Sequence, residues 1–334
     1  MKRPIRFAVI GVNHYHILDM TKALLEGGAE LVSFCEPDPV NAAKFTAQFP
    51  HAVAHEKAAI LEDPTIQMIA SAAVPCDRAS LGIEVMRHGK DYFVDKAGVT
   101  SLEQLAEVRR VQAETQRIYS IYYGERFESK ATVKAAEMAR AGAIGKVIQT
   151  IGLGPHRLNA HLRPTWFFDL PQTGGILCDL ASHQMDQFLY FTNSIQADVV
   201  AAHVANYHNP QTPGLQDFGE ATLVGNGGRG YCRVDWFTPN GLAVYGDTRC
   251  MVLGTDGYID LRKNIDIDGK PGANHFLLVD HNGTQRISVD DFQLPFIGQF
   301  LNDIENRTET AMSQTHCFLA SELALKAQAL GQKK

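Results

Sequence analysis

The sequence contains few cysteines and no cluster of basic residues. Six cysteines are spread over 334 residues without a CxxC pair, which argues against a disulfide framework and favours reduced, mostly buried thiols. Acidic residues outnumber basic residues by 37 to 31, the net charge is −6 and no basic stripe is present, so we expect no nucleic-acid partner. No apolar stretch is long enough to cross a bilayer, so we expect no membrane partner either.

We also expect no secretory leader. Met1-Lys2-Arg3 precedes the apolar residues 7–10, but that run is too short, it leads into Gly11, and no small-residue cleavage site follows it. We therefore expect a cytoplasmic protein. A hydrophobic content of 45% and a charged content of 20% are ordinary for a globular protein, and the length is enough for two domains with a sizeable core.

Strand-like and helical patterns alternate over residues 1–122. Strand-like runs cover 5–10, 29–36, 66–73, 91–96 and 117–123, and helical patterns cover 15–26, 40–49, 56–62, 78–88 and 102–116. This alternation predicts an α/β domain with a parallel, doubly wound sheet that binds its ligands at the carboxyl ends of the strands. Thr100-Ser101-Leu102-Glu103 has the spacing of a capping box, which supports the last of these helices.

Residues 123–334 are richer in strands. A helical pattern over 129–141 is followed by strand-like runs at 147–154, 197–203, 220–224, 230–237, 250–254 and 257–261, and helical patterns return at 295–305 and 312–330. Asn226-Gly227-Gly228 is typical of a hairpin turn. We expect an α+β domain built on a large, mostly antiparallel open sheet with helices on one face.

Gly11 stands between the first apolar strand and the first helical pattern. A strand that enters a helix through a glycine turn directs backbone N–H groups and the positive end of the helix at one place, where a pyrophosphate can be held. Glu36 ends the next strand-like run, where an acidic residue would meet an adenosine ribose diol. This junction predicts dinucleotide binding; the alternative is a plain strand–turn–helix.

The usual dinucleotide fingerprint has three glycines, and only the first is present here. Asn13 occupies the second position and is a plausible replacement, because asparagine tolerates a left-handed backbone. His16 occupies the third, where its bulk should push the helix away from the strand. His14 and His16 lack the neighbours that a zinc site needs, so we expect no metal there.

A second group of polar residues follows Gly174-Gly175. Asp179, His183 and Asp186 have the spacing of one face of a single helix. A carboxylate one turn from an imidazole can share a proton with it and orient it. The alternatives are a buried hydrogen-bonded pair that anchors the helix, or a metal pair.

Lys96 closes the strand-like run that ends in Asp95-Lys96-Ala97. At the carboxyl edge of a parallel sheet, its ammonium group could hold a substrate hydroxyl and lower the cost of deprotonating it. The alternative is a solvated lysine at the start of a loop.

Three features follow one another along the chain: the glycine turn at Gly11, the lysine motif at Lys96, and Gly174-Gly175 with Asp179 and His183. In this order they resemble the glucose–fructose oxidoreductase / inositol dehydrogenase / rhizopine catabolism (Gfo/Idh/MocA) oxidoreductase family over nearly the whole chain. Members of the family have a Rossmann domain followed by a domain on a large, mostly antiparallel sheet. Their lysine motif is Glu-Lys-Pro, and here Ala97 replaces the proline that would constrain the backbone. The segment around Pro75 also lacks the asparagine that usually follows its proline.

The resemblance implies an NAD(P)-dependent oxidation or reduction at a carbinol carbon of a sugar, cyclitol or polyol. Lys96 would contact the nicotinamide and the reacting hydroxyl, His183 would exchange its proton, and Asp179 would orient the substrate. The implied cofactor contacts are Gly11, Asn13, His14, Glu36, Pro75 and Lys96. Glu36 favours NAD over NADP, because a carboxylate repels a 2′-phosphate. The resemblance also implies a homodimer or homotetramer formed through the exposed sheet face.

The loop that leads into Gly174 should border the active cleft. Trp166 could stack on a sugar ring, and the basic residues of the loop could bind hydroxyls or a carboxylate. The expected substrate contacts are Tyr123, Arg126, His156, Arg157, Arg163, Trp166 and Asp179. The alternative is a surface loop packed by its own aromatic residues.

Two further functions fit the same fold. The incomplete glycine fingerprint is compatible with a non-catalytic nucleotide-binding or sensor protein. An NAD-dependent lyase or hydrolase that oxidises its substrate transiently would use the same residues. We expect a dehydrogenase that acts on a CH–OH group of a small-molecule substrate, and the fold does not name that substrate.

Overall fold

The computed structural model describes residues 3–333, and the chain forms two compact units. The first unit comprises Met1–Tyr122 with Pro295–Phe318, and the second comprises Tyr123–Leu294 with Leu319–Lys334. We expected the division at 122/123 with every later residue in the second domain, whereas Pro295–Phe318 groups with the first unit. The reason is aromatic packing and charge: the ring of Phe300 lies 4.9 Å from that of Phe93, and Arg307 forms an ion pair with Asp91 at 2.6 Å.

The first unit has the parallel sheet that the sequence predicts. Its six strands follow the order β3-β2-β1-β4-β5-β6, and all the pairs are parallel. The strands are β1 (Arg6–Ile10), β2 (Glu30–Cys35), β3 (Val53–Ala54), β4 (Met68–Ser71), β5 (Asp91–Asp95) and β6 (Tyr119–Tyr122). The two-residue strand β3 was not predicted, because it is too short to give a pattern.

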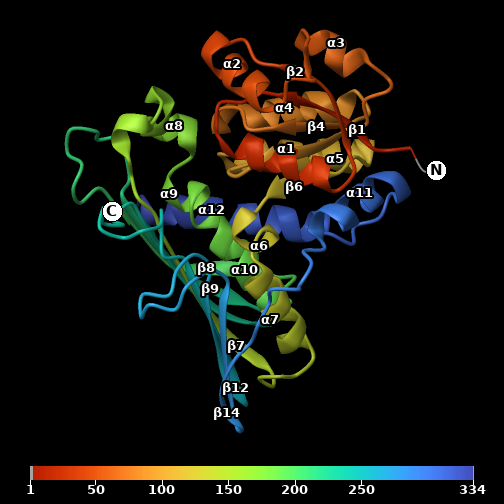
Figure 1. The fold of residues 1–334 in the computed structure, drawn as a ribbon. Coiled ribbons are helices and arrows are strands. Elements are labelled where there is room, and N and C mark those ends of the chain that lie inside the picture. Colours follow the sequence, from red (N-terminus) through yellow and green to blue (C-terminus); the bar gives the residue numbers. More distant parts are fainter. Residues whose placement is uncertain (1–2, 334) are drawn as a thin grey trace. The chain divides into compact units, whose positions relative to one another are not determined.

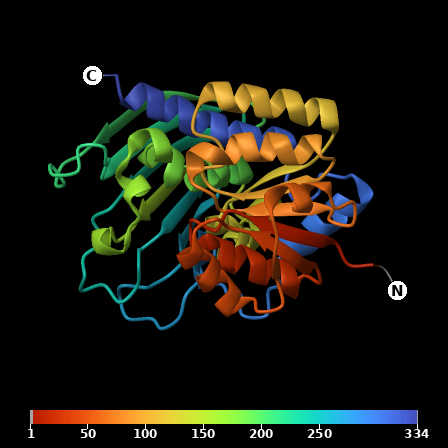
Figure 2. The same ribbon diagram turned by 90° about the horizontal axis from the view of Figure 1, so that it is seen from above.

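Helices connect these strands, as Figure 1 shows. They are α1 (His16–Glu26), α2 (Pro39–Gln48), α3 (Lys57–Glu62), α4 (Pro75–Arg87) and α5 (Leu102–Thr115), and α11 (Phe296–Asn306) joins them from the end of the chain. Figure 2 shows α4 and α5 side by side. The cap of α5 is one residue later than predicted: Ser101 Oγ accepts from the N–H of Gln104 at 3.1 Å, and Gln104 Oε1 accepts from the N–H of Thr100 at 2.8 Å.

The second unit is built on an eight-stranded sheet of order β14-β13-β12-β11-β7-β10-β9-β8. Its strands are β7 (Val147–Pro155), β8 (Ala197–Ala205), β9 (Phe218–Gly225), β10 (Gly228–Asp235), β11 (Arg249–Gly254), β12 (Gly257–Arg262), β13 (His275–Asp280) and β14 (Gly283–Arg286). Among the described strand pairs of this second sheet, only β7–β10 is parallel, so the sheet is mostly antiparallel, as predicted. The hairpin between β9 and β10 is confirmed, and β13 and β14 were missed.

The helices of the second unit are short except for three. They are α6 (Gly124–Phe127), α7 (Lys130–Arg140), α8 (Leu170–Thr173), α9 (Ile176–Asp179), α10 (Ser182–Thr192) and α12 (Gln314–Gly331), with 3₁₀ turns at Ala160–Leu162 and Thr165–Phe168. The first residues of α12, up to Phe318, group with the first unit, and the rest of the helix belongs to the second. Helix α10 packs closely on β7 because Gly152 has no side chain: a Cβ there would lie 2.6 Å from Gln184 Cγ. This close approach fixes the helix that carries His183.

The sheet of the second unit has one buried and one exposed face. The buried face contributes Val252, Ile259 and Phe276 to a core completed by alanines of α7. The opposite face exposes Met251, Leu253 and Tyr258 at 39–40%. The expected homo-oligomer through this face stays a prediction. All six cysteines are free, and none of the helices within residues 3–333 combines the length and apolar character needed to span a membrane.

Candidate active site

Gly11 makes the turn that joins β1 to α1. Its φ is +81°, and a Cβ at this position would lie 2.7 Å from the Cβ of Ala73, so both the backbone conformation and the space require glycine. Asn13 is not among the described residues with positive φ. The expectation that it replaces a left-handed glycine is therefore wrong: the second position of the turn takes a conformation open to any residue.

The turn presents backbone donors to a ligand. Among residues 3–333 the N–H groups of Asn13 and His16 have no hydrogen-bond acceptor, and His16 is the first residue of α1. Unpaired N–H groups at a helix N-terminus are suited to phosphate oxygens. The residues present therefore fit a pyrophosphate, although two of the usual glycines are missing.

Glu36 lies beside this turn, directly after β2. Its Oε2 accepts from the N–H of Val12 at 2.8 Å, and its Oε1 accepts from the N–H of Asp38 at 2.9 Å. These bonds hold the carboxylate against the turn, and each oxygen retains a lone pair for a ribose hydroxyl.

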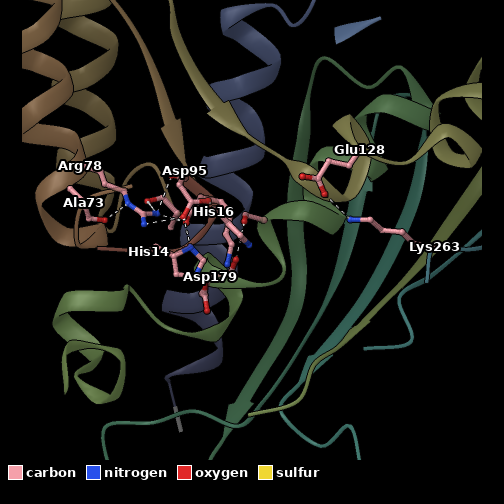
Figure 3. A network of polar contacts seen from close by, with 11 residues as sticks. His14, His16, Ala73, Arg78, Asp95, Glu128, Asp179 and Lys263 are labelled. Atoms are coloured by element: carbon pink, nitrogen blue, oxygen red, sulfur yellow. Dashed lines mark hydrogen bonds and ion pairs between the residues drawn. The ribbon is translucent and has the colours of Figure 1, made fainter. Parts of the chain in front are cut away.

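Asp95 joins the two histidines of the turn, as Figure 3 shows. Its Oδ2 lies 3.0 Å from His14 Nδ1, and its Oδ1 lies 2.8 Å from His16 Nδ1. The bulk of His16 does not push α1 away, contrary to our expectation, because the ring turns towards Asp95 and leaves Ile17, Met20 and other residues of α1 buried.

The carboxylate of Asp95 also has a permanent cation. Arg78 Nη2 lies 3.1 Å from Asp95 Oδ2, and both side chains are buried. Burial by itself would raise the pKa of Asp95, but the charges of His16, Arg78 and His14 hold it well below its usual range. Asp95 therefore stays ionised.

The same three residues form a group with metal-ligand chemistry. The ligand atoms of His14, His16 and Asp95 lie within 4.8 Å of one another, so the histidines have a neighbour that the sequence did not indicate. The guanidinium of Arg78 already balances Asp95 and would repel a divalent ion at the same place. We interpret the group as a hydrogen-bonded network that orders the turn.

His14 gives this network a measurable pH dependence. Burial and the neighbouring charge of His16 lower the pKa of His14 to about 3, against the opposing effect of Asp95. An unfolded chain binds a proton at this residue below about pH 6.5 and the folded chain does not, so acidification from pH 6.5 towards 3 must cost stability. We expect His14→Asn to flatten the dependence of the free energy of unfolding on pH by up to about 1.4 kcal/mol per pH unit within this window.

Urea unfolding of both proteins at pH 7.5 and pH 5.0 checks this expectation. The comparison uses the change of stability with pH rather than the absolute stability, because the substitution also removes the 3.0 Å contact between His14 and Asp95. If the free energy of unfolding changed equally with pH in the two proteins, His14 would have the same protonation in the folded and the unfolded chain, contrary to this expectation.

Arg78 organises the segment that carries Lys96. Its Nε donates to the carbonyl of Ala73 at 2.7 Å, and its Nη1 donates to the carbonyls of Asp95 (3.1 Å), Lys96 and Ala97 (3.3 Å). The guanidinium is 1% exposed. Arg78 thus supplies a backbone constraint at the place where the family motif has proline.

Lys96 directly follows β5 and is 5% exposed. The carboxyl ends of β1, β4 and β5 lie side by side in the sheet, so Lys96 belongs to the same sheet edge as Gly11 and Ala73. Pro75, the other expected cofactor contact at this edge, is buried at the first position of α4.

In the second unit, Asp179 and His183 stand on two helices rather than one. Asp179 is the last residue of α9, and His183 lies in the first turn of α10. The prediction of one continuous helix is wrong, because the helix is interrupted at Leu180 and Ala181. Asp186 binds Arg126: its two oxygens each accept from the guanidinium at 2.7 Å.

Arg126 and Tyr123, which we expected to contact the substrate, are buried around the helix that carries His183. Arg126 is fully enclosed by Asp186 and by the rings of Phe127 and Tyr190, 4.6 and 4.5 Å from its guanidinium carbon. Tyr123 is 0% exposed; its hydroxyl lies 3.1 Å from Ser321 Oγ, and its ring meets that of His183 edge-on at 6.3 Å. These contacts hold α10 and orient the imidazole. Lys263 is half-buried and pairs with Glu125 at 3.4 Å and with Glu128 at 3.5 Å; Figure 3 shows Lys263 and Glu128.

The basic residues of the loop before Gly174 are engaged within the unit. Arg157 Nη2 donates to the carbonyls of Pro239, Leu242 and Val244 at 2.6–3.2 Å. Arg163 stacks on the rings of Phe167, Trp236 and Tyr245, and the His156 ring packs on the last two at 5.7 and 5.2 Å. Trp166 packs on Phe167 at 6.2 Å.

A pocket lies beside Asp179, and its aromatic wall is not the expected one. Phe167 and Trp236 line it, together with Asp179 and Gln216, and Trp166 does not. Sequence reasoning missed Arg78, Gln216 and Trp236. Trp236 could have been predicted as a site residue from its position at the end of a strand-like run. Nothing in the sequence distinguished Arg78 or Gln216 from structural residues.

The chain matches two family models. Residues 5–123 match "Oxidoreductase family, NAD-binding Rossmann fold", and residues 132–260 match "GFO/IDH/MocA C-terminal domain". A crystal structure from Erwinia carotovora atroseptica SCRI1043, provisionally assigned as an oxidoreductase, is 46% identical, with coverage of 98% of this chain and 99% of that chain and a TM-score of 0.96.

Two relatives with defined activities are more distant. The scyllo-inositol 2-dehydrogenase (NAD(+)) of Bacillus subtilis (strain 168) is 25% identical over 92% of this chain and 86% of its own length. A levoglucosan dehydrogenase in complex with NADH and levoglucosan is 16% identical, with 98% and 96% coverage and a TM-score of 0.79, a likeness that concerns the fold alone. The chain belongs to the Gfo/Idh/MocA oxidoreductase family, and its first unit is an NAD-binding Rossmann domain.

Proposed function

We propose that this oxidoreductase is an NAD-dependent dehydrogenase of a carbinol carbon in a sugar, cyclitol or polyol. The observation that carries the proposal is the buried Lys96 at the carboxyl end of β5, on the same sheet edge as the unpaired N–H groups of Asn13 and His16. A sensor that only binds a nucleotide has no need of a buried ammonium at this place. The expectation of a cytoplasmic enzyme stays a prediction.

The residues divide the work according to their chemistry. Bound NAD⁺ supplies a hydride acceptor for the carbinol carbon. Lys96 donates a hydrogen bond to the reacting hydroxyl and stabilises the negative charge that develops on its oxygen. His183 accepts the hydroxyl proton on its imidazole, and Asp179 accepts from a further hydroxyl and favours the protonated imidazole. The turn after β1 holds the pyrophosphate, with Gly11, Asn13 and His14 around it.

Cofactor preference tests this function together with the role of Glu36. We expect the wild-type protein to form NADH, measured at 340 nm, from at least one member of a panel of sugars, cyclitols and polyols, and to use NADP⁺ poorly. Glu36→Ser should lose or reverse the preference, because the carboxylate that repels a 2′-phosphate is gone. A matched change at the exposed Glu62→Ser should leave the preference unchanged. Equal use of NAD⁺ and NADP⁺ by the wild type would contradict the assignment of Glu36.

A further inference from the structure

Apart from Asp179 itself, the residues that line the pocket beside Asp179 have no role in the dehydrogenase mechanism proposed above. It measures about 260 Å³ including its open mouth, and Phe167, Trp236, Gln216 and Asp179 line it. This volume includes open solvent at the mouth, so the enclosed space is much smaller. The pocket therefore suits a single hydroxylated group at one end of a substrate rather than a whole molecule.

The aromatic wall of the pocket is held rigidly. The rings of Phe167 and Trp236 lie 5.3 Å apart at 71°, and each residue is 7% exposed. The guanidinium of Arg163 lies 5.0 Å from the Trp236 ring. A fixed apolar ring surface of this kind stacks on the C–H face of a carbohydrate-like group.

The amide of Gln216 has only one possible orientation. Its Oε1 accepts from the N–H of Ile176 at 3.1 Å and from Gln328 Nε2 at 2.9 Å. A backbone N–H can only donate, so this atom must be the oxygen. Gln328 is oriented in the same way, because its Oε1 accepts from the N–H of Leu177 at 3.1 Å.

This arrangement leaves one donor for a ligand. Within residues 3–333, Gln216 Nε2 has no acceptor, and Gln216 lines the pocket. Gly175 makes the arrangement possible: its φ is +91°, and a Cβ there would lie 2.3 Å from Gln328 Cδ. The second glycine of Gly174-Gly175 therefore leaves the space in which the two amides meet.

We propose that this pocket is a substrate subsite for a neutral, hydroxylated end group, read by the Gln216 amide and by Asp179. A hydroxyl both donates and accepts, so neighbouring hydroxyls satisfy the amide N–H and the carboxylate together. The carboxylate of a sugar acid would meet Asp179 with like charge. The subsite rests on the dehydrogenase function proposed above and narrows its substrates to neutral polyols, cyclitols and sugars, with sugar acids rejected.

Gln216→Glu tests the subsite with little disturbance of the fold. The new carboxylate keeps an acceptor for Ile176 and Gln328 but replaces the free N–H₂ donor with an acceptor. We expect kcat/KM for a neutral substrate to fall at least about 10-fold, mostly through KM. Gln285→Glu adds the same charge at an exposed position of β14 and should leave kcat/KM unchanged. An unchanged KM in folded Gln216→Glu, with the wild type active, would overturn the subsite and leave the dehydrogenase function intact.

A binding measurement decides the proposal even if no NADH forms. The chain has two tryptophans, Trp166 and Trp236. The Trp166→Phe variant therefore has one tryptophan, Trp236, whose fluorescence reports on the wall of the pocket. In this variant we expect scyllo-inositol, levoglucosan or glucose to change the tryptophan fluorescence, and gluconate and L-tartrate to leave it unchanged. A stronger response to the acids, or no response to any of the five compounds, would contradict the subsite.

Discussion

Replacing His183 with alanine should lower kcat by about 10²- to 10⁴-fold while NAD⁺ still binds. The imidazole is 5% exposed in the first turn of α10, and the rigid support of Tyr123 and α10 places it for proton exchange. The cofactor turn belongs to the other compact unit, so the affinity for NAD⁺ should change little. Steady-state kinetics and titration of NAD⁺ measure the two quantities separately.

The matched control for this variant is His281→Ala. His281 is exposed in the turn between β13 and β14, and its loss should change neither kcat nor cofactor affinity. Equal turnover by His183→Ala and the wild type would remove His183 from the mechanism. A loss of NAD⁺ binding along with turnover would instead show that the substitution disturbs the fold.

Replacing Arg78 with methionine should cost about 3–5 kcal/mol in the free energy of unfolding. The guanidinium is 1% exposed, pairs with Asp95 and accounts for hydrogen bonds to the carbonyls of Ala73, Asp95, Lys96 and Ala97. Its removal leaves a buried carboxylate without its permanent cation and several carbonyls without donors. Urea unfolding measures the loss.

Two further variants separate the local charge from a general effect on α4. Arg87→Met removes an exposed arginine from the same helix, whose 3.5 Å pair with Glu107 contributes little, so stability should hardly change. Adding Asp95→Asn to Arg78→Met should restore part of the lost stability, because the unpaired charge disappears. A double variant no more stable than Arg78→Met would show that Asp95 does not need Arg78.

The order of most strands and helices could be predicted from the sequence, because most of the longer elements have a clear apolar period. The strands from β1 to β12 were predicted apart from β3, and the parallel first sheet followed from the β–α alternation. Two of the three missed strands have a common reason: β3 has two residues, and all four residues of β14 are exposed, so neither is marked by burial. The third, β13, was missed although it contributes Phe276 and Leu278 to the core. The return of α11 to the first unit was not readable, because aromatic contacts such as Phe300 with Phe93 join residues far apart in the chain.

Site residues could be predicted from the sequence where they stand at the end of a strand, because ligands bind at the carboxyl ends of parallel strands. Gly11, Glu36 and Lys96 stand at the ends of strands, and the structure puts them at one sheet edge. Arg157 of the loop before Gly174 and Arg126 of α6 could not be assigned in this way, because the residues that bind them are distant in sequence. Arg78 was overlooked for the opposite reason: it interrupts an ordinary helix pattern, and only the folded chain brings four carbonyls around it.

Transfer of deuterium tests the central claim most directly. A neutral polyol substrate carrying deuterium on the reacting carbon is incubated with the protein and NAD⁺, and the NADH formed is analysed by mass spectrometry. Direct dehydrogenation predicts one deuterium in each NADH and a substrate oxidised in equal amount. Deuterium that returns to a cleaved or rearranged product without net NADH, or bound NAD⁺ that never acquires deuterium from any compound of the panel, would contradict the account.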